Sequence, residues 1–100
     1  MSDELDGFDE LLQHRSRLAA CVLLSDDVSL SFVRLRELLG ETDGNLGAQL
    51  RKLEEAGYVK AKKEFAARKP VTWYTLTERG RKALRKHLEA MERLIKRAKV

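Results

Sequence analysis

The sequence predicts a mainly α-helical domain with a small β hairpin, that is, an α+β fold. Four stretches of the chain repeat apolar residues every three or four positions, which is the period of an amphipathic helix. Two short stretches between residues 59 and 76 alternate instead and are joined by a few residues, as in a hairpin. The last helical stretch is long and carries a heptad pattern. We therefore expect a helical body, a hairpin and a long final helix.

The length and the charge of the chain limit what it can do. One hundred residues form one compact domain. No apolar run approaches the roughly 20 residues that span a bilayer, so no membrane partner is expected. Residues 1–10 contain five acids and no base, whereas the other ninety residues contain 20 bases and 11 acids, a formal charge of +9. A basic body of this kind is typical of proteins that bind polyanions. Residues 1–7 are predicted to form a solvated acidic tail.

The first part of the domain is predicted to contain two helices. The first spans residues 8–24, and its apolar positions are Phe8, Leu11, Leu12, Leu18, Ala19, Val22 and Leu23. Residues 25–27 end it, and residues 28–31 alternate as a very short strand would. Ser31 caps the second helix, residues 32–39, and Gly40 ends it in a left-handed conformation. The residues of this helix available for burial are Val33, Leu35, Leu38 and Leu39.

A third helix follows, with its own start and stop signals. The Thr42 hydroxyl can accept a hydrogen bond from the first turn. Leu46, Leu50 and Leu53 then fall on one face of the helix, and Gly57 ends it.

The hairpin comes next and is basic. In its first strand Val59, Ala61 and Phe65 share one face, and in its second strand alternate residues from 71 to 76 do the same. Residues 66–69 are expected to connect the strands, and Pro70 is expected to limit pairing at its edge. The charged residues of the hairpin are Lys60, Lys62, Lys63, Arg68 and Lys69 against Glu64 alone.

The final helix is predicted from Thr77, its cap, to about residue 99. Its apolar residues are spaced 4, 3, 4 and 3, which indicates a narrow seam for a partner helix rather than a broad core stripe. A seam that runs this far past a small domain favours dimerisation over packing within the chain. The predicted dimer-interface residues are Leu84, Leu88, Met91, Ile95 and Ala98.

The order helix, short strand, helix, helix, hairpin, helix is that of a winged helix-turn-helix. Residues 38–46, 50–59, 68–70 and 72–80 resemble the corresponding parts of the small MarR/ArsR-like winged-helix regulators of bacteria and archaea, and the resemblance covers roughly residues 8–90. It implies a DNA-binding domain over residues 8–76 and a C-terminal dimerisation helix over residues 77–100. It further implies a homodimer that binds double-stranded DNA and regulates transcription, more often as a repressor.

The third helix carries most of the residues predicted to contact DNA. With its leucines turned inward, its outward arc contains Asn45 and Gln49, amides suited to adenine edges, and Arg51 and Lys52, suited to phosphate or guanine. Two glycines in so short a helix cost on the order of 1 kcal/mol each relative to alanine, which a close approach to DNA would explain. The alternative interpretation is the solvated face of an ordinary core helix.

The hairpin is the second predicted contact with DNA. In the resembling family the tip of this hairpin, which is called the wing, reaches the minor groove or the flanking phosphates. Arg68 is therefore the candidate for insertion into the minor groove. A lysine-rich edge that prevents strand-to-strand aggregation is the alternative. The predicted DNA-binding residues are Thr42, Gly44, Asn45, Ala48, Gln49, Arg51, Lys52, Arg68 and Lys69.

The other reactive residues indicate no enzyme, cofactor or metal site. Cys21 is expected to be a small core residue, and a single cysteine cannot form an internal disulfide, which suits a reducing cytoplasm. No secretory signal precedes the first helix. His14 and His87 lack the neighbouring ligands of a metal site. No catalytic residues are predicted, and the sequence identifies no small-molecule effector.

Two rival functions fit the same order of elements. A winged helix can act as a protein-interaction module in a larger complex, which predicts no DNA affinity and a final helix that is monomeric or pairs with another protein. RNA binding is disfavoured because Trp73 and Tyr74 point to opposite faces of one strand and form no stacking platform.

Overall fold

A computed structural model describes residues 3–100 and confirms the predicted α+β fold. The observed elements are a short 3-10 helix η1 (Glu10–Gln13), α1 (Arg15–Leu24), β1 (Leu30–Ser31), α2 (Phe32–Leu39), α3 (Asp43–Glu55), β2 (Val59–Ala66), β3 (Lys69–Leu76) and α4 (Glu78–Arg97). Among residues 3–100, no helix combines the length and the apolar character that crossing a bilayer would require.

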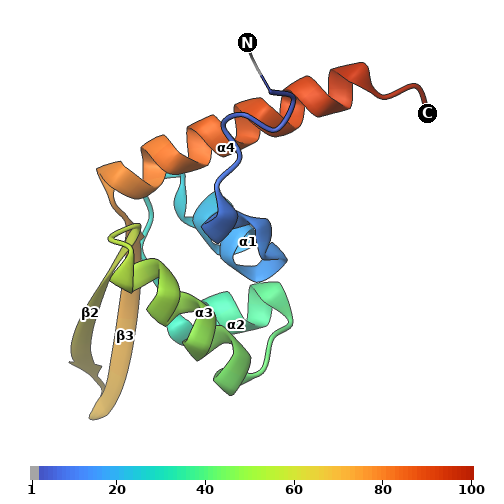
Figure 1. Ribbon diagram of the computed structural model, residues 1–100. Helices are drawn as coiled ribbons and strands as arrows, with labels where there is room; N and C mark the ends of the chain where they lie inside the picture. Colours follow the sequence, from blue (N-terminus) through green and yellow to red (C-terminus); the bar gives the residue numbers. More distant parts are fainter. Residues whose placement is uncertain (1–2) are drawn as a thin grey trace.

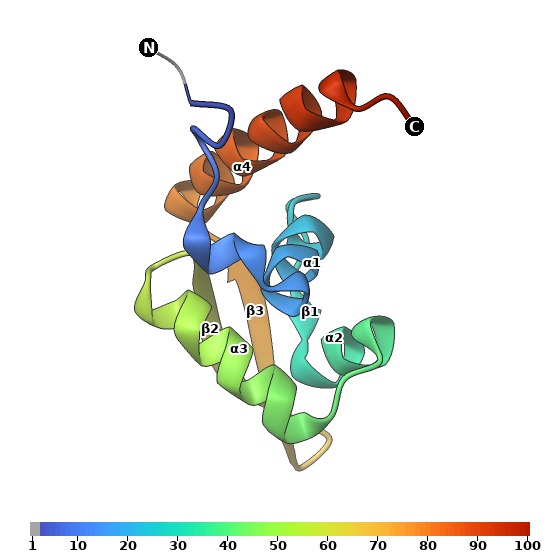
Figure 2. The ribbon, with the colours of Figure 1, turned by 45° about the vertical axis from the view of Figure 1, so that its right-hand side comes forward.

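The elements form a helical body beside a three-stranded antiparallel sheet in the order β1-β3-β2. β2 and β3 make a long hairpin, and β1 adds two residues to the outer side of β3. The hairpin turn and the start of α3 lie at one edge of the molecule, and α4 crosses the opposite end (Figures 1 and 2). The C-terminal half of α4 extends away from the rest of the body.

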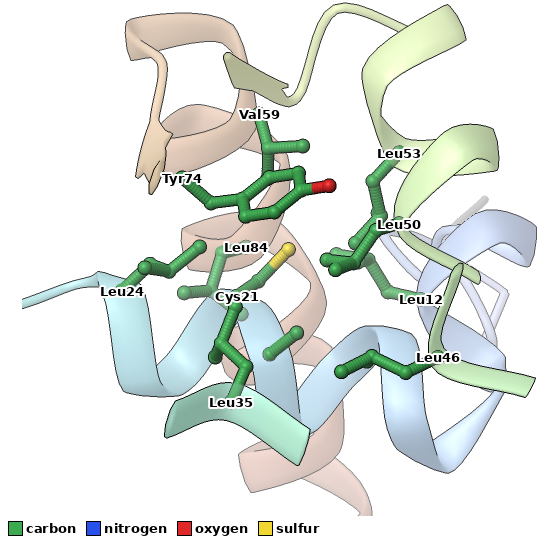
Figure 3. Packing of buried hydrophobic residues seen from close by; sticks show 11 residues of the cluster. Leu12, Cys21, Leu24, Leu35, Leu46, Leu50, Leu53, Val59, Tyr74 and Leu84 are labelled. Atoms are coloured by element: carbon green, nitrogen blue, oxygen red, sulfur yellow. The ribbon is translucent and has the colours of Figure 1, made fainter. Parts of the chain in front are cut away.

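The core lies between α1, α3, the inner face of the hairpin and the first turns of α4. The predicted stripe of α3 is confirmed, because Leu46, Leu50 and Leu53 are each at most 1% exposed. Tyr74 and Val59 close the cluster from the sheet side, and Cys21 lies in its middle (Figure 3). The helices are therefore joined to the sheet by side chains that alternate from β2 and β3.

The first predicted helix is not continuous, so its expected span of residues 8–24 is wrong. His14 has an extended backbone (φ −76°, ψ 124°) that separates η1 from α1. Each part has its own cap: Asp9 accepts a hydrogen bond from the Leu11 amide at 2.9 Å, and His14 Nδ1 accepts one from the Ser16 amide at 3.2 Å. These side chains accept hydrogen bonds from backbone amides that a continuous helix would use for its own hydrogen bonds. The spacing of apolar residues gives no sign of this competition.

Some residues expected to be buried are exposed. Val33 and Leu38 of α2 are 50% and 44% exposed, and only Leu35 of this helix is fully buried. α2 has eight residues and turns a single narrow face to the core, so its other apolar positions face solvent. Phe65 shares a strand face with Val59 but is 80% exposed because the hairpin extends beyond the core.

The hairpin connection is shorter than expected. The strands pair up to Ala66 opposite Lys69, so pairing runs past Pro70, which lies opposite Phe65. The turn consists of Ala67 and Arg68, with φ values of 51° and 67°. Two successive residues with positive φ give the twist that favours two-residue hairpins, even without the usual glycine.

The N-terminal segment lies along α4. Asp6 accepts a hydrogen bond from Arg93 through its backbone oxygen, and Glu4 forms an ion pair with Arg97 at 3.4 Å. Gly7 (φ 93°) places its backbone close to Ala90. In the acidic tail expected over residues 1–7, Glu4, Asp6 and Gly7 contact α4. Met1 and Ser2 lie outside the described residues.

Candidate nucleic-acid interface

The start of α3 is fixed by hydrogen bonds on both sides of the turn that precedes it. Thr42 Oγ1 accepts a hydrogen bond from the Asn45 amide at 3.2 Å, which confirms the predicted cap. Asp43 pairs with Arg36 of α2 at 2.6 Å, and Gly40 adopts the left-handed conformation expected of it (φ 64°). This turn therefore sets the angle between α2 and α3.

The outward side of α3 presents most of the predicted residues to solvent. Thr42, Gly44 and Asn45 are exposed at the start of the helix, and Arg51 and Lys52 are exposed two turns later. Ala48 and Gln49 are half-buried. The face therefore offers an amide and two cations, separated by small residues.

The side chain of Gln49 is hydrogen-bonded to Arg17 of α1. Arg17 donates from Nη1 to Gln49 Oε1 and from Nε to the Leu11 carbonyl oxygen. Among residues 3–100, Gln49 forms this side-chain hydrogen bond through its oxygen and none through its amide nitrogen. Sequence reasoning missed Arg17, because nothing in the order of residues indicates a contact across 32 positions.

The glycines of α3 have no packing role within the domain. A Cβ atom at Gly44 or at Gly47 would meet no heavy atom within 4 Å, apart from the helix backbone itself. Neither residue has a positive φ. Their helix-weakening effect is therefore not explained by the structure of the protein alone.

The turn of the hairpin brings a second group of cations to the same edge of the molecule (Figure 2). Arg68 and Lys69 are exposed at and beside the turn. Lys62 pairs with Glu64 at 3.1 Å, which accounts for the one acid of the hairpin. The cations of the hairpin turn therefore lie at the edge of the molecule where α3 begins, whereas Arg51 and Lys52 are exposed in the second half of α3.

The predicted seam of α4 divides into a buried and an exposed part. Leu84 belongs to the core of this chain and is 4% exposed, and Met91 is half-buried. Leu88 and Ile95 are 40% and 68% exposed, and Ala98 is an exposed residue at the end of the helix. At about 100° per residue, the seam lies on the side of α4 roughly opposite to Arg93, where the N-terminal segment packs. That segment leaves Leu88 and Ile95 uncovered.

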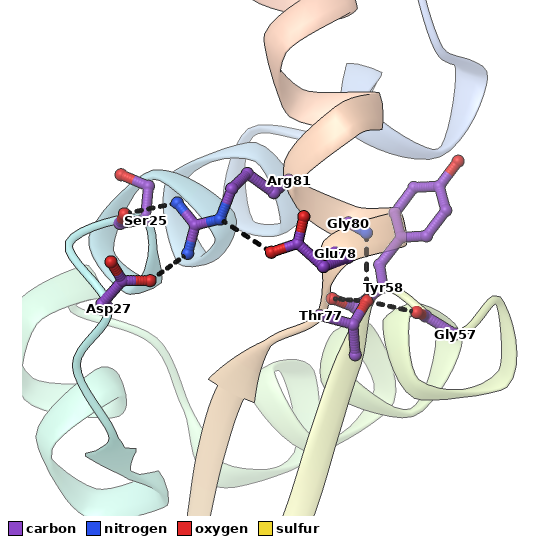
Figure 4. Close-up of polar contacts among 8 residues, drawn as sticks. All are labelled: Ser25, Asp27, Gly57, Tyr58, Thr77, Glu78, Gly80 and Arg81. Atoms are coloured by element: carbon purple, nitrogen blue, oxygen red, sulfur yellow. Dashed lines mark hydrogen bonds and ion pairs between the residues drawn. The ribbon is translucent and has the colours of Figure 1, made fainter.

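The first turn of α4 is locked to the start of the hairpin (Figure 4). Thr77 Oγ1 donates a hydrogen bond to the Gly57 carbonyl oxygen at 2.6 Å. Thr77 Oγ1 also accepts a hydrogen bond from the Gly80 amide at 3.0 Å. Arg81 donates to the Ser25 carbonyl oxygen at 2.7 Å and pairs with Asp27 at 2.6 Å. α4 is thus fixed relative to both α1 and the hairpin.

A buried polar cluster joins the N-terminal segment to α4. His87 is 2% exposed, its Nδ1 accepts a hydrogen bond from the Asp9 amide at 2.9 Å, and its ring meets Phe8 edge to face at 5.2 Å. Burial lowers the pKa of His87, although the Asp9 carboxylate opposes the effect. Burial and the hydrogen bond that Tyr58 donates to Asp9 raise the pKa of Tyr58 to about 12.

Cys21 is the core residue that the sequence predicts. It is fully buried, and burial raises the pKa of its thiol to about 12, so the reactive thiolate is scarce at neutral pH. Within residues 3–100, no three His, Cys, Asp or Glu side chains are grouped so that they could hold a metal ion.

Comparisons with known proteins agree with this geometry. A family model described as a winged helix DNA-binding domain matches residues 16–95. An uncharacterized protein from Methanocaldococcus jannaschii is 38% identical over 65 residues, which is 65% of this chain and 71% of the relative.

Two solved structures show the same arrangement of elements. A transcriptional regulator homologue from Pyrococcus horikoshii OT3 superposes with a TM-score of 0.84 at 27% identity, over 92% of this chain and 91% of that one. ZitR from Lactococcus lactis, a zinc-responsive MarR family member, superposes with a TM-score of 0.63 at 20% identity, over 83% of this chain and 56% of its own.

Proposed function

This chain belongs to the family of winged-helix DNA-binding domains, and from that premise we propose that it regulates transcription as a homodimer bound to double-stranded DNA. One observation carries the proposal. The exposed start of α3 and the basic turn of the hairpin lie at the same edge of the molecule. A duplex placed there meets a helix of groove-filling size and a cationic flap together.

In this arrangement α3 enters the major groove and the hairpin turn lies over the neighbouring minor groove. Arg51, Lys52 and Lys69 neutralise phosphates, and Arg68 points into the minor groove. Asn45 and the free amide nitrogen of Gln49 contact base edges. Because few polar side chains lie on α3, most of the affinity comes from phosphates and a small part from base contacts.

The homodimer is built on the exposed part of the α4 seam. Leu88 and Ile95 are exposed aliphatic residues one heptad apart, with Met91 between them, and a second copy of the helix would cover them. Two copies related by a two-fold axis present their α3 helices about 34 Å apart, one turn of the duplex. The proposed binding site is therefore roughly palindromic, and occupancy of such a site at a promoter represses transcription.

The first experiment measures duplex binding by fluorescence anisotropy over a range of salt concentrations. Arg68 in the minor groove displaces counterions from the flanking phosphates as the three phosphate-binding cations do, so each protomer contributes four cations. The expected slope of log affinity against log salt is then about −7 for a dimer, at about −0.9 per neutralised phosphate. A slope near zero, or no binding at low salt, contradicts the proposal and favours the protein-interaction alternative.

A charge-matched pair of triple variants tests the interface. Arg51→Ala, Lys52→Ala and Arg68→Ala together are expected to make the slope shallower by about 5 for the dimer. The control removes the same charge from exposed positions on α4 and just after it, as Lys82→Ala, Arg85→Ala and Lys99→Ala, and is expected to change the slope little. Equal losses in both variants would indicate diffuse attraction rather than this interface.

Gly44 offers a sharper test of close contact. Gly44→Ala adds a methyl group that meets no protein atom, so weaker DNA binding by this variant can arise only at the DNA. Gly47→Ala is the matched control, because Gly47 lies toward the flank of α3 and is equally free of protein contacts. We expect weaker binding from Gly44→Ala alone.

The dimer is tested by light scattering after size-exclusion chromatography. The double variant Leu88→Ser, Ile95→Ser is expected to be monomeric, folded and weakened in DNA binding. Val33→Ser on α2 is the control for removing an exposed aliphatic side chain. Selection of genomic fragments by the purified protein then supplies a promoter on which the repressor role is measured by transcription in vitro.

A further inference from the structure

Phe65 is an exposed aromatic residue near the tip of the hairpin. Its side chain is 80% exposed, although phenylalanine is among the residues most often buried. Pro70 lies opposite it on β3. Two apolar residues therefore face each other across the hairpin, one residue pair away from its last pair, Ala66 and Lys69. Nothing in the fold requires a phenyl ring at this place.

The ring is on the side of the hairpin that faces α3. Residues two apart share one face of a strand, so Phe65 lies on the same face as Val59, which is buried, and Ala61, which is half-buried. At about 3.3 Å per residue, Phe65 is about 13 Å further along β2 than Ala61. It therefore continues the inner face of the hairpin past the core, toward the edge where α3 begins.

The charges around the ring identify the kind of partner it fits. Residues 62–69 contain four bases against one acid, a formal charge of +3, and that acid is already paired with Lys62. An apolar protein surface would have to desolvate these cations, which is costly. A duplex satisfies them with its phosphates, and the floor of its minor groove accepts an apolar side chain between base pairs.

We propose that Phe65 is a wedge that enters the minor groove and partly separates two stacked base pairs while the neighbouring cations hold the phosphates. This inference rests on the proposed DNA-binding function and adds a source of specificity to it. Pyrimidine–purine steps such as TA separate most easily. The wing therefore prefers DNA that deforms readily, at positions where α3 makes no contact.

The test uses two 30-base-pair duplexes of identical base composition, one of alternating TA steps and one with an uninterrupted A-tract. Affinity is measured for wild type, Phe65→Ala and Phe65→Leu, with Val28→Ala as a control for loss of an exposed apolar residue. In the alternating duplex, 2-aminopurine replaces one adenine, because its fluorescence rises when it is unstacked. Energy transfer between dyes at the duplex ends measures bending.

The wedge predicts a specific pattern. Phe65→Ala lowers affinity for the alternating duplex about tenfold, as when a phenyl ring stays in water. It lowers affinity for the A-tract much less, and the rise in 2-aminopurine fluorescence and the bend are lost. Phe65→Leu is expected to keep part of the affinity, the fluorescence rise and the bend, and Val28→Ala is expected to change none of the three. Because Phe65 is exposed, neither variant at this position is expected to impair folding.

Three outcomes would overturn the wedge. Equal weakening on both duplexes would place the ring against the sugar–phosphate backbone. A changed oligomeric state in Phe65→Ala would make it a protein contact. Unchanged binding in Phe65→Ala, with the triple variant of Arg51, Lys52 and Arg68 still defective, would remove the wedge and leave the proposed function standing. If wild type binds neither duplex at low salt, the proposed function itself fails.

Discussion

The same substitution, glycine to alanine, is expected to have opposite effects at two helical positions of this fold. Gly80 lies in the first turn of α4 and Gly47 in the interior of α3. A Cβ atom at Gly80 would be 2.2 Å from the Tyr58 carbonyl oxygen and 2.8 Å from a methyl group of Leu76. A Cβ atom at Gly47 would meet nothing within 4 Å.

The size of each effect follows from these contacts. To relieve a 2.2 Å contact, α4 and the backbone of Tyr58 must separate by about 1 Å, which costs about 1–3 kcal/mol as overpacking. The separation also strains the hydrogen bond that the Thr77 amide donates to the Tyr58 carbonyl oxygen at 3.0 Å, worth about 1 kcal/mol. Gly80→Ala is therefore expected to lower the free energy of unfolding by about 2–4 kcal/mol. Gly47→Ala is expected to raise it by about 1 kcal/mol through helix propensity.

The assay is urea unfolding followed by circular dichroism, supported by thermal melts. All variants are compared at one protein concentration, because a dimer's stability depends on it. Gly47→Ala is expected to raise Tm by about 4–8 °C, the shift that 1 kcal/mol produces in a domain of about this size. Gly80→Ala is expected to lose a large part of a total stability of about 5–15 kcal/mol.

Two results would refute the reasoning. A Gly80→Ala protein within about 0.5 kcal/mol of wild type, the range of ordinary surface substitutions, would mean that α4 does not approach the hairpin backbone so closely. A destabilised Gly47→Ala protein would mean that the α3 glycine has a packing role within the chain, which would remove one reason for placing α3 against DNA.

The remaining predictions concern buried and bridging side chains. His87 is held neutral, with its pKa below the usual 6.5, so the unfolded chain binds the proton more readily and stability is lost as pH falls through 6.5 toward the lower folded pKa. Unfolding free energies at pH 8 and pH 5 check this, and His87→Asn, which keeps an acceptor for the Asp9 amide, is expected to reduce the difference. Cys21 is expected to react with a thiol reagent only as fast as the domain opens, so a rate equal to that of a free thiol would contradict its burial. Arg17→Ala is expected to cost about 2 kcal/mol for its two lost hydrogen bonds. It is also expected to change the base preference that the proposed contact of Gln49 with DNA would give, read by comparing selected DNA sites. An unchanged preference would show that Arg17 does not orient that amide.

Local signals in the sequence predicted the helices with strong caps. α2 and α3 begin and end where their cap residues indicate, because a capping bond and a left-handed glycine depend only on neighbouring residues. The α3 leucines are buried as predicted, since three residues at helical spacing must face the same side. The break at His14 was missed because the caps formed by Asp9 and His14 lie within a pattern that already fits one helix.

The candidate interface was only partly readable from the sequence. The order of elements and the basic hairpin predicted which segments face DNA in the proposed complex. The sequence could not predict which side chains at that surface already form hydrogen bonds within the protein. Gln49, for example, accepts one from Arg17, which is 32 positions away. The same holds for α4, where spacing predicted one seam and packing divided it into a buried Leu84 and an exposed Ile95.

The sequence by itself determined the order of the elements and the charge of the surface, and the bounds of α2 and α3, because caps, periodicity and composition are properties of nearby residues. Only the tertiary structure decided how far the hairpin extends past the core, and therefore that Phe65 faces solvent among cations. Burial depends on which distant segments fill the space above a residue. For Phe65 no segment among residues 3–100 does so, and the ring is left free to meet DNA in the proposed complex.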